Sequence, residues 1–190
     1  MPVLEIRFHG RGGQGSVIAA ELLARAAFKE GKNVQSFPFF GVERRGAPVA
    51  AFCRVSDQPI RLRTSITTPD IVIVLDPGLL KTVPVTKGAK PGGLLLVNTE
   101  RGPDRVGIPF DGRVATVDAT SIAIAHGLGS RTQPIVNTSI LGAFAKVSGV
   151  VSLDSVVAAI KESVPAKREE NAAAAVDAYE KALLATEAVA

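Results

Sequence analysis

The chain has 190 residues and a formal net charge of +4, from 22 Lys and Arg against 18 Asp and Glu. A charge this small and this dispersed does not predict a nucleic-acid partner, and the single cysteine, Cys53, excludes an internal disulfide and a four-cysteine iron–sulfur cluster. The length suits one domain over residues 1–190, and the sequence has neither a signal peptide nor a membrane-spanning apolar run, so we expect a cytoplasmic protein with no membrane partner.

The first forty residues predict a strand, a helix and a second strand. Residues 4–8 form a short strand-like run, and apolar residues recur at helical spacing over residues 16–29. Ser16 is a residue type that caps helices, and Gly31 is typical of a helix end. Residues 33–40 predict the second strand, which Pro38 disturbs near its end. Together these segments predict a right-handed βαβ unit.

The middle of the chain supplies the rest of a sheet. Residues 48–55 and 59–64 are strand-like and flank the polar turn SDQ, which predicts an antiparallel hairpin added to the sheet. The runs DIVIVLD at 70–76 and GGLLLVNT at 92–99 are continuously apolar, as parallel strands covered on both faces are, and RVATVDAT at 113–120 resembles them. The sheet is therefore expected to be mixed and mostly parallel.

The final third predicts helices. They are expected over residues 137–149, over residues 152–164 with Ser152 as N-cap, and over the alanine-rich residues 167–190, which contain no glycine or proline. The predicted fold class is therefore α/β: a three-layer αβα sandwich, Rossmann-like, with a long C-terminal helix.

A glycine-rich loop lies between the first strand and the first helix. Gly10, Gly12 and Gly15 match the G-x-G-x-x-G spacing, in which residues without a Cβ let the backbone approach a phosphate at a helix N-terminus. The intervening residues Arg11, Gly13 and Gln14 complete the candidate ligand loop. A nicotinamide cofactor also needs an acidic residue at the end of the second strand, and none is present there. A nicotinamide site and a purely structural turn stay open as alternatives.

A second candidate loop follows the second strand, in the sequence FPFFGVERRGAPV. Its arginines are suited to phosphate or carboxylate groups, and its exposed aromatics are suited to a partner protein. A hairpin entry with solvated charges is the alternative interpretation. The candidate residues are Gly41, Glu43, Arg44, Arg45 and Gly46.

Other polar residues carry weaker predictions. Asn137 and Thr138 are candidate ligand contacts at the same edge of the sheet, although helix capping alone also explains them. Asp76 follows a strand, where it either forms a turn or contacts a ligand. His9 and His126 lack neighbouring metal ligands or catalytic partners. We therefore expect no metal site and no catalytic residue in this chain.

Four motifs together resemble one protein family. FHGRGGQGS, FPFFGVERRGAPVAAF, IRLR before PDIVIVLDP, and PIVNTSILGAFAK are similar to the gamma subunit, or gamma domain, of 2-oxoacid:ferredoxin oxidoreductases, especially the pyruvate and 2-ketoisovalerate type. The resemblance runs in order from about Glu5 to about Lys161. It implies a subunit of a complex that converts a 2-oxoacid and coenzyme A to acyl-CoA and CO2 and passes electrons to ferredoxin or a related acceptor.

The resemblance also implies how the work is divided among subunits. Thiamine diphosphate, Mg and the [4Fe-4S] clusters would be held by partner alpha, beta and ferredoxin-like delta subunits, with no cofactor held by this chain alone. By motif, residues 10–15 and 41–46 would lie at the shared active site and help to bind coenzyme A. A purely structural assembly subunit is the alternative, and a related branch of the family acts on aryl glyoxylates.

Overall fold

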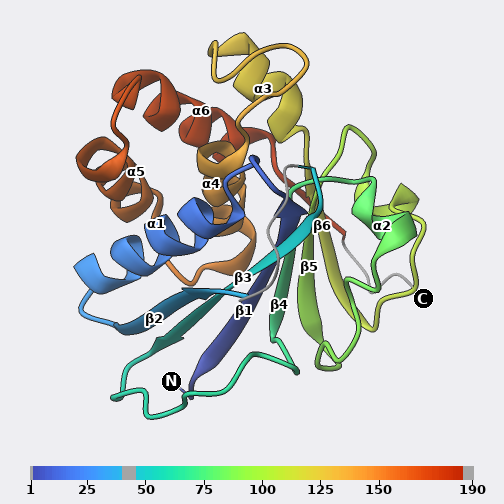
Figure 1. Cartoon of the computed structure of the whole chain (residues 1–190), viewed down its shortest axis with the longest axis vertical. Helices are drawn as coiled ribbons and strands as arrows, with labels where there is room; N and C mark the ends of the chain where they lie inside the picture. The colour runs from blue at the N-terminus through green and yellow to red at the C-terminus, as the bar shows by residue number, and fades with distance from the viewer. Residues whose placement is uncertain (1, 40–45, 186–190) are drawn as a thin grey trace.

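A seven-stranded sheet forms the centre of the chain, in the order β2-β3-β1-β4-β5-β6-β7. The structure is a computed structural model that describes residues 2–39 and 46–185 (Figure 1). The strands are β1 (Leu4–Arg11), β2 (Asn33–Pro38), β3 (Pro48–Ser56), β4 (Ile71–Val74), β5 (Gly93–Asn98), β6 (Gly112–Val117) and β7 (Leu183–Leu184).

The strand directions confirm a mixed, mostly parallel sheet. β1, β4, β5 and β6 pair in parallel, whereas β3 runs antiparallel to both β1 and β2, so β2 runs parallel to β1 without touching it. At the other edge, β7 pairs antiparallel with β6. The βαβ unit therefore exists, but an antiparallel strand is inserted between its two parallel strands.

Helices cover the two faces of the sheet unequally. One face carries α1 (Ser16–Lys29), α4 (Asn137–Ser148), α5 (Leu153–Ser163) and α6 (Arg168–Lys181), with α3 (Ala119–Ala125) beside them (Figure 1). The opposite face is covered by the short α2 (Leu79–Thr82) and by loops that include a 3-10 turn (Pro103–Arg105). The predicted three-layer αβα class is confirmed, with one thin outer layer.

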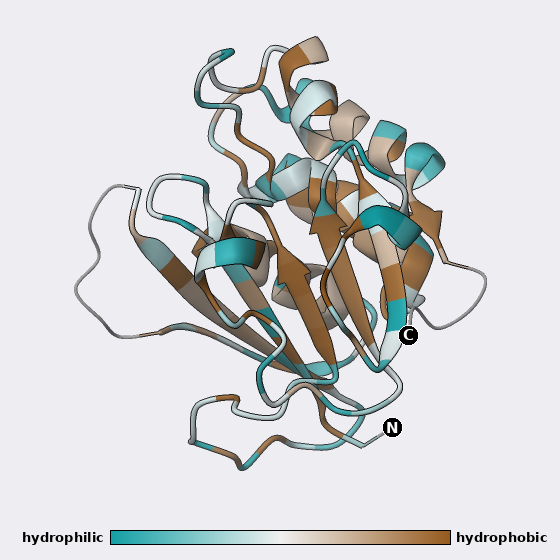
Figure 2. Cartoon of the chain, turned by 90° about the vertical axis from the view of Figure 1, so that its right-hand side faces the viewer, coloured by the Kyte–Doolittle hydropathy of each residue, from teal (hydrophilic) through white to brown (hydrophobic). Residues whose placement is uncertain are grey.

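The apolar strands explain why this arrangement is stable. Successive side chains of a strand point to opposite faces, so in β4 Ile71 and Ile73 enter the core under the helices, whereas Val72 and Val74 enter the second core under α2. Figure 2 shows the resulting hydrophobic strands in the middle of the sheet. Continuous apolar runs are therefore the sequence mark of a strand with two buried faces.

The prediction of a hairpin that begins with β3 is wrong for the second strand. Residues 59–64 form no strand, and all of residues 61–64 are exposed. β3 has no free edge for them, since β1 and β2 occupy both of its sides. Leu62 is 44% exposed, so the segment also lacks the apolar face that a strand would bury.

Arg54 ties this segment to the sheet in place of strand pairing. Its side chain is 1% exposed, and its Nε donates to Oε1 of Glu5 at 2.9 Å. The other guanidinium nitrogens donate to the carbonyl oxygen of Thr64 at 2.7 Å and to Oε1 of Gln35 at 3.3 Å. The guanidinium carbon also lies 5.4 Å from the ring centre of Phe37. One buried cation thus joins β1, β2, β3 and the loop.

Helix ends test the predicted caps. Ser152 caps α5, and its side chain accepts a hydrogen bond from the Ser155 amide. Gly31 follows the end of α1 with a positive φ, as predicted. The prediction for Ser16 is wrong by one residue, because Gly15 occupies the N-cap position and Ser16 is the first helical residue.

The C-terminal helix is shorter than predicted. α6 ends at Lys181, and Leu183 and Leu184 then form the edge strand β7. Nζ of Lys146 donates to the carbonyl oxygens of Glu180 and Ala182 at 2.9 and 3.1 Å. In a longer helix, these carbonyl oxygens would instead accept hydrogen bonds from amides one turn further on. A long-range contact therefore stops a segment of high helix propensity.

α4 and α6 pack unusually close together. A Cβ added at Gly142 would overlap the carbonyl group of Ala175 and lie 2.9 Å from its Cα. The alanines of α6 that face this contact are buried, including Ala172, Ala175 and Ala178. Small residues on both helices therefore let the two backbones approach each other.

Candidate ligand site

The candidate site lies at the carboxyl ends of β1 and β4, where the strand order reverses. The chain leaves β1 through α1 toward β2 on one side, and leaves β4 through α2 toward β5 on the other side. α1 and α2 lie on opposite faces of the sheet (Figure 1). In open α/β sheets, ligands bind in the crevice at such a reversal.

The glycine loop delivers the chain to an uncapped helix N-terminus. Gly13 and Gly15 have φ values of +97° and +80°, which lie in the left-handed region that favours glycine. Gly15 occupies the N-cap position of α1, and no described side chain caps that helix. The first amide groups of a helix have no acceptor within the helix and carry partial positive charge. These amides are therefore suited to an anionic group.

Two glycines of the loop make room for other parts of the chain. A Cβ at Gly10 would collide with the hydroxyl of Ser16, and one at Gly15 would lie 2.5 Å from Nδ2 of Asn137. A Cβ at Gly13 would meet no atom of the described residues within 4 Å. The structural interpretation of the motif thus holds for Gly10 and Gly15, while no described residue packs against Gly13 in this way.

Asp76 organises the loop from the end of β4. One carboxylate oxygen accepts hydrogen bonds from Nε of Arg11 and Nε2 of Gln14, both at 3.0 Å, and the other accepts from the Gly78 amide at 2.8 Å. Oε1 of Gln14 in turn accepts from the Arg11 amide at 2.7 Å. The turn-forming interpretation of Asp76 is confirmed. Its hydrogen bonds to Arg11 and Gln14 were not predicted, because 65 residues separate Asp76 from Arg11 in the sequence and only the pairing of β4 with β1 brings them together.

The second candidate loop ends beside the glycine loop. Gly12 donates its amide to the carbonyl of Ala47 at 2.9 Å, and the Gly46 amide donates to the carbonyl of Gly12 at 3.1 Å. A terminal nitrogen of Arg11 donates to the carbonyl of Gly46 at 3.2 Å. The two motifs are therefore neighbours in space. Gly41, Glu43, Arg44 and Arg45 themselves lie outside the described residues.

Asn137 and Thr138 lie beside the glycine loop, at the start of α4. Neither residue is the N-cap, which is Val136, and Asn137 packs its amide group against Gly15. The Thr138 hydroxyl donates to Oδ1 of Asn171 at 2.8 Å, which ties α4 to α6. Thr138 therefore has a structural contact of its own, while Asn137 lies closer to the candidate site.

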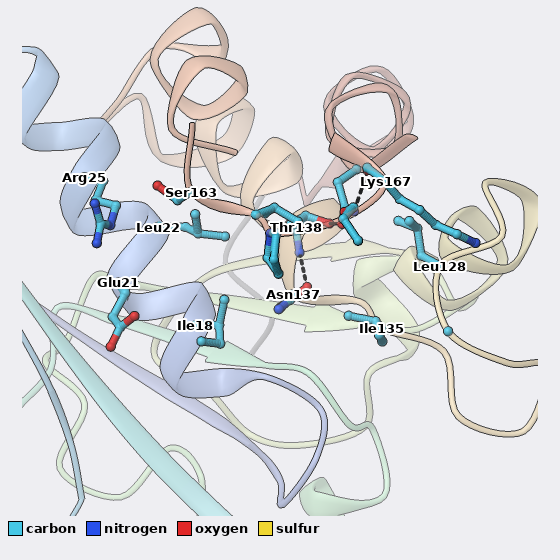
Figure 3. Close-up of a pocket in the computed structure, with 15 residues that line it drawn as sticks. Ile18, Glu21, Leu22, Arg25, Leu128, Ile135, Asn137, Thr138, Ser163 and Lys167 are labelled. Atoms are coloured by element: carbon cyan, nitrogen blue, oxygen red, sulfur yellow. Dashed lines mark hydrogen bonds between the residues drawn. The ribbon is translucent and has the colours of Figure 1, made fainter. Parts of the chain in front are cut away.

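A pocket of about 600 Å³ adjoins this position (Figure 3). It lies between α1, the start of α4 and the connection from α5 to α6. Its lining is mostly apolar and includes Ile18, Leu22, Leu128, Ile135 and Val164. Figure 3 shows Ile18 and Leu22 of α1 opposite Leu128 and Ile135.

The two histidines have structural partners. His9 and Arg7 are buried on the α2 side of β1, where Nε of Arg7 donates to Nε2 of His9 at 3.0 Å. Arg7 also donates to the carbonyls of Val85 and Lys87 at 2.9 and 2.8 Å. His126 contacts the carboxylate of Asp177 at 2.7 Å, which holds the pKa of that carboxyl below its usual range.

Burial of His9 predicts acid sensitivity. Desolvation, with a smaller effect of the Arg7 charge, lowers the pKa of His9 to about 4, from the ordinary 6.5. Between pH 6.5 and pH 4, His9 is therefore protonated in the unfolded chain but neutral in the folded chain. The free energy of unfolding is highest above pH 6.5 and falls as the pH drops toward 4. We expect a loss of about 2 kcal/mol in the free energy of unfolding between pH 7 and pH 5.

Urea unfolding of the full chain and of His9→Gln at both pH values measures this loss. The variant keeps an oxygen acceptor for Arg7 but has no titrating ring, so most of the dependence between pH 7 and pH 5 should disappear. An equal pH dependence in both proteins would assign it to other groups.

The described residues offer little for metal or redox chemistry. In residues 2–39 and 46–185, no cluster of three or more His, Cys, Asp or Glu is placed to hold a metal ion. Cys53 is fully buried in β3, and desolvation raises the pKa of its thiol to about 12, so it is a small core residue as predicted. No described helix is long and apolar enough to cross a membrane.

Comparisons with known proteins agree over nearly the whole chain. Residues 5–181 match the family described as pyruvate ferredoxin/flavodoxin oxidoreductase. A common gamma subunit of pyruvate/ketoisovalerate oxidoreductases from Thermococcus kodakarensis is 57% identical over 186 residues, which are 96% of this chain and 98% of the relative.

Solved structures show the same fold. A pyruvate oxidoreductase subunit PORC from Thermotoga maritima superposes with a TM-score of 0.82 at 36% identity, covering 97% of this chain and 99% of that one. The 2-oxoglutarate:ferredoxin oxidoreductase from Magnetococcus marinus, solved with 2-oxoglutarate, coenzyme A and succinyl-CoA bound, has a TM-score of 0.67 at 20% identity. That match covers 94% of this chain and 30% of the longer chain, and at this identity it shows the fold alone.

Proposed function

Because this chain belongs to the pyruvate ferredoxin/flavodoxin oxidoreductase family, as a gamma subunit of a 2-oxoacid oxidoreductase complex, we propose that it helps to bind coenzyme A at an active site shared with other subunits. The complex would decarboxylate a 2-oxoacid oxidatively and transfer the acyl group to the coenzyme A thiol. The oxoacid would be pyruvate or a branched-chain or aryl relative of it, and the two electrons would pass to ferredoxin or a related acceptor.

The uncapped N-terminus of α1, at the reversal of strand order, carries this proposal. Coenzyme A has a pyrophosphate and a 3′-phosphate, and helix amides and arginine forks are the groups that bind phosphates in proteins. Arg11 is held beside the loop by Asp76 and is still one-third exposed. The side chains of Ser16 and Asn137 occupy the space beside Gly10 and Gly15, which supports a rigid loop. No described atom lies within 4 Å of a Cβ built at Gly13, which supports access for a ligand.

The binding residues would come from two motifs and the start of α4. Within the glycine loop these are Gly10 to Gly15, and within the second loop Gly41, Glu43, Arg44, Arg45 and Gly46, whose position is supported by the contact of Gly46 with Arg11. Asn137 is supported by its packing on Gly15, and Thr138 would act through that neighbour. A distant structure of the same fold contains coenzyme A, which agrees with the proposal.

The redox cofactors would belong to partner subunits. A single buried cysteine does not fit an iron–sulfur cluster in this chain. Thiamine diphosphate, Mg and the [4Fe-4S] clusters would therefore be held by alpha, beta and ferredoxin-like delta subunits. This chain, treated as one gamma-type domain over residues 1–190, would position coenzyme A by its phosphates and would hold none of the reacting groups itself.

Replacement of Arg11 by methionine tests the ligand site. In the assembled complex, Arg11→Met should raise KM for coenzyme A about tenfold or more, because a hydrogen bond to a charged group contributes about 1.5–3 kcal/mol. KM for the 2-oxoacid should stay unchanged. Arg113→Met, an exposed arginine at the start of β6, is the matched control.

The second loop is tested in the same assay. Arg44→Ala combined with Arg45→Ala should also raise KM for coenzyme A, and unchanged values for both this variant and Arg11→Met would remove the two loops from the site. Lower yield of complex with normal kinetics would instead favour the assembly subunit. That second candidate is supported by the internal packing of Gly10 and Gly15.

A further inference from the structure

One face of α1 is exposed and carries two large apolar side chains. Four exposed residues lie along it: Ile18, Glu21, Arg25 and Phe28, called here the α1 stripe. Ile18 is 46% exposed, and Phe28, at 69%, is more exposed than any other large apolar side chain of the described residues. The rest of the helix packs against the sheet and against α4 and α5, so the stripe is the face of α1 that no other described element covers.

The spacing of the α1 stripe is that of a helix–helix seam. Its residues follow one another at intervals of three, four and three, which is the alternation of a and d positions in a heptad. An isolated surface helix has no need for apolar groups at both ends of such a seam. The pattern therefore indicates packing against another helix.

The order of residues along the stripe is self-complementary. Reading from either end gives an apolar residue, a charge, the opposite charge and an apolar residue. When two such helices pack antiparallel about a two-fold axis near residue 23, position 18 meets position 28 and position 21 meets position 25. A two-fold interface requires this reciprocity, and here it pairs acid with base.

The charges of the stripe are available for that pairing. Among the described residues, neither Glu21 nor Arg25 has an ion-pair partner within its own chain, although a spacing of four residues would allow them to pair with each other. Lys29, which borders the stripe, is different, because its ammonium contacts Glu162 at 2.6 Å. Figure 3 shows Glu21 and Arg25 on α1, at the side of the pocket that they help to line.

The pocket beside Ile18 offers space for an aromatic ring. It has a volume of about 600 Å³ and lies next to the end of the stripe that would receive position 28 of an antiparallel helix. Leu22, Leu128, Ile135 and Val164 line it together with Ile18. Ile135 is itself 41% exposed, so a ring placed there would cover apolar surface on both sides.

We propose that the α1 stripe is an interface between two copies of this chain. The two α1 helices pack antiparallel, Phe28 of each copy enters the pocket beside Ile18 of the other, and Glu21 of each copy pairs with Arg25 of the other. The proposal does not depend on the coenzyme A site.

Sedimentation equilibrium of the full chain tests the interface. The chain should dimerise, and Phe28→Ser should raise the dissociation constant of the dimer at least tenfold, since this exposed residue has little to do with folding. Glu21→Arg should raise it by a similar factor, because it places arginine opposite arginine in both symmetric pairs. Glu170→Arg, the same change on the exposed face of α6, should have no effect.

The double variant Glu21→Arg/Arg25→Glu decides the register. It restores opposite charges only in an antiparallel two-fold pair and should return the dissociation constant to within about threefold of the original. A chain that stays monomeric at every concentration overturns the proposal, as does a dimer that the single variants leave intact. Loss of other subunits from the complex, with the chain itself monomeric, would also overturn it and would assign the stripe to one of them.

Discussion

Replacement of Arg54 by methionine is expected to lower the free energy of unfolding of the full chain by about 3 to 5 kcal/mol. The guanidinium is 1% exposed and satisfies three acceptors on Glu5, Gln35 and Thr64. Methionine fills a similar volume but donates nothing, so the mostly buried Glu5 carboxylate is left without its cation. The cost arises from that unpaired charge and from the freed carbonyl of Thr64.

Urea unfolding monitored by circular dichroism measures the effect of Arg54→Met. Arg63→Met is the matched control, since it makes the same substitution at an exposed arginine in residues 61–64. The free energy of unfolding of that variant should change by less than about 0.5 kcal/mol. Adding Glu5→Gln to Arg54→Met should recover part of the loss, because it removes the unpaired charge. A loss no larger than that of the control would contradict a structural role for the buried cation.

Replacement of Gly142 by alanine is expected to cost about 3 kcal/mol, although alanine is the better helix former. The added methyl group overlaps the backbone carbonyl of Ala175, so α4 and α6 must separate. Separation would also expose alanines of α6 that are now buried, including Ala172, Ala175 and Ala178.

Thermal and urea unfolding of Gly142→Ala give the size of this effect. Adding Ala175→Gly should not rescue the variant, because the overlap involves the main chain rather than the Ala175 side chain. A net stabilisation of about 0.5 to 1 kcal/mol, which helix propensity alone predicts, would show that the two helices can move apart freely.

Local pattern was sufficient for most of the fold. The continuous apolar run of β4 predicts a strand with two covered faces, and the periodicity of residues 16–29 predicts α1 at its observed bounds. The errors lie where contacts with residues distant in the sequence determine the local structure. Lys146 ends α6 before Leu183, and the occupied edges of β3 leave residues 59–64 outside the sheet.

The sequence predicts the separate parts of the candidate site but not the hydrogen bonds that connect them. The position between a strand and a helix identifies the glycine loop, and the position at the carboxyl end of a strand identifies Asp76. Their connection depends on β1 and β4 being neighbours, which strand order alone determines. The contacts of Arg11 with Asp76 and Gly46 likewise require the fold, because 65 and 35 residues separate the partners.

Because β3 is inserted beside β1 and pairs with β2, the sheet itself fixes both ends of the connection between β2 and β3. Pro38 pairs with Ala51, and the Phe39 amide donates to the carbonyl of Ala50, so the two ends of the connection are clamped together before it begins. Loop-closure entropy changes by only about 0.6 kcal/mol for each doubling of loop length. A change in the length or sequence of a connection anchored in this way therefore has little effect on the sheet, because the pairing of β2 with β3 does not depend on it.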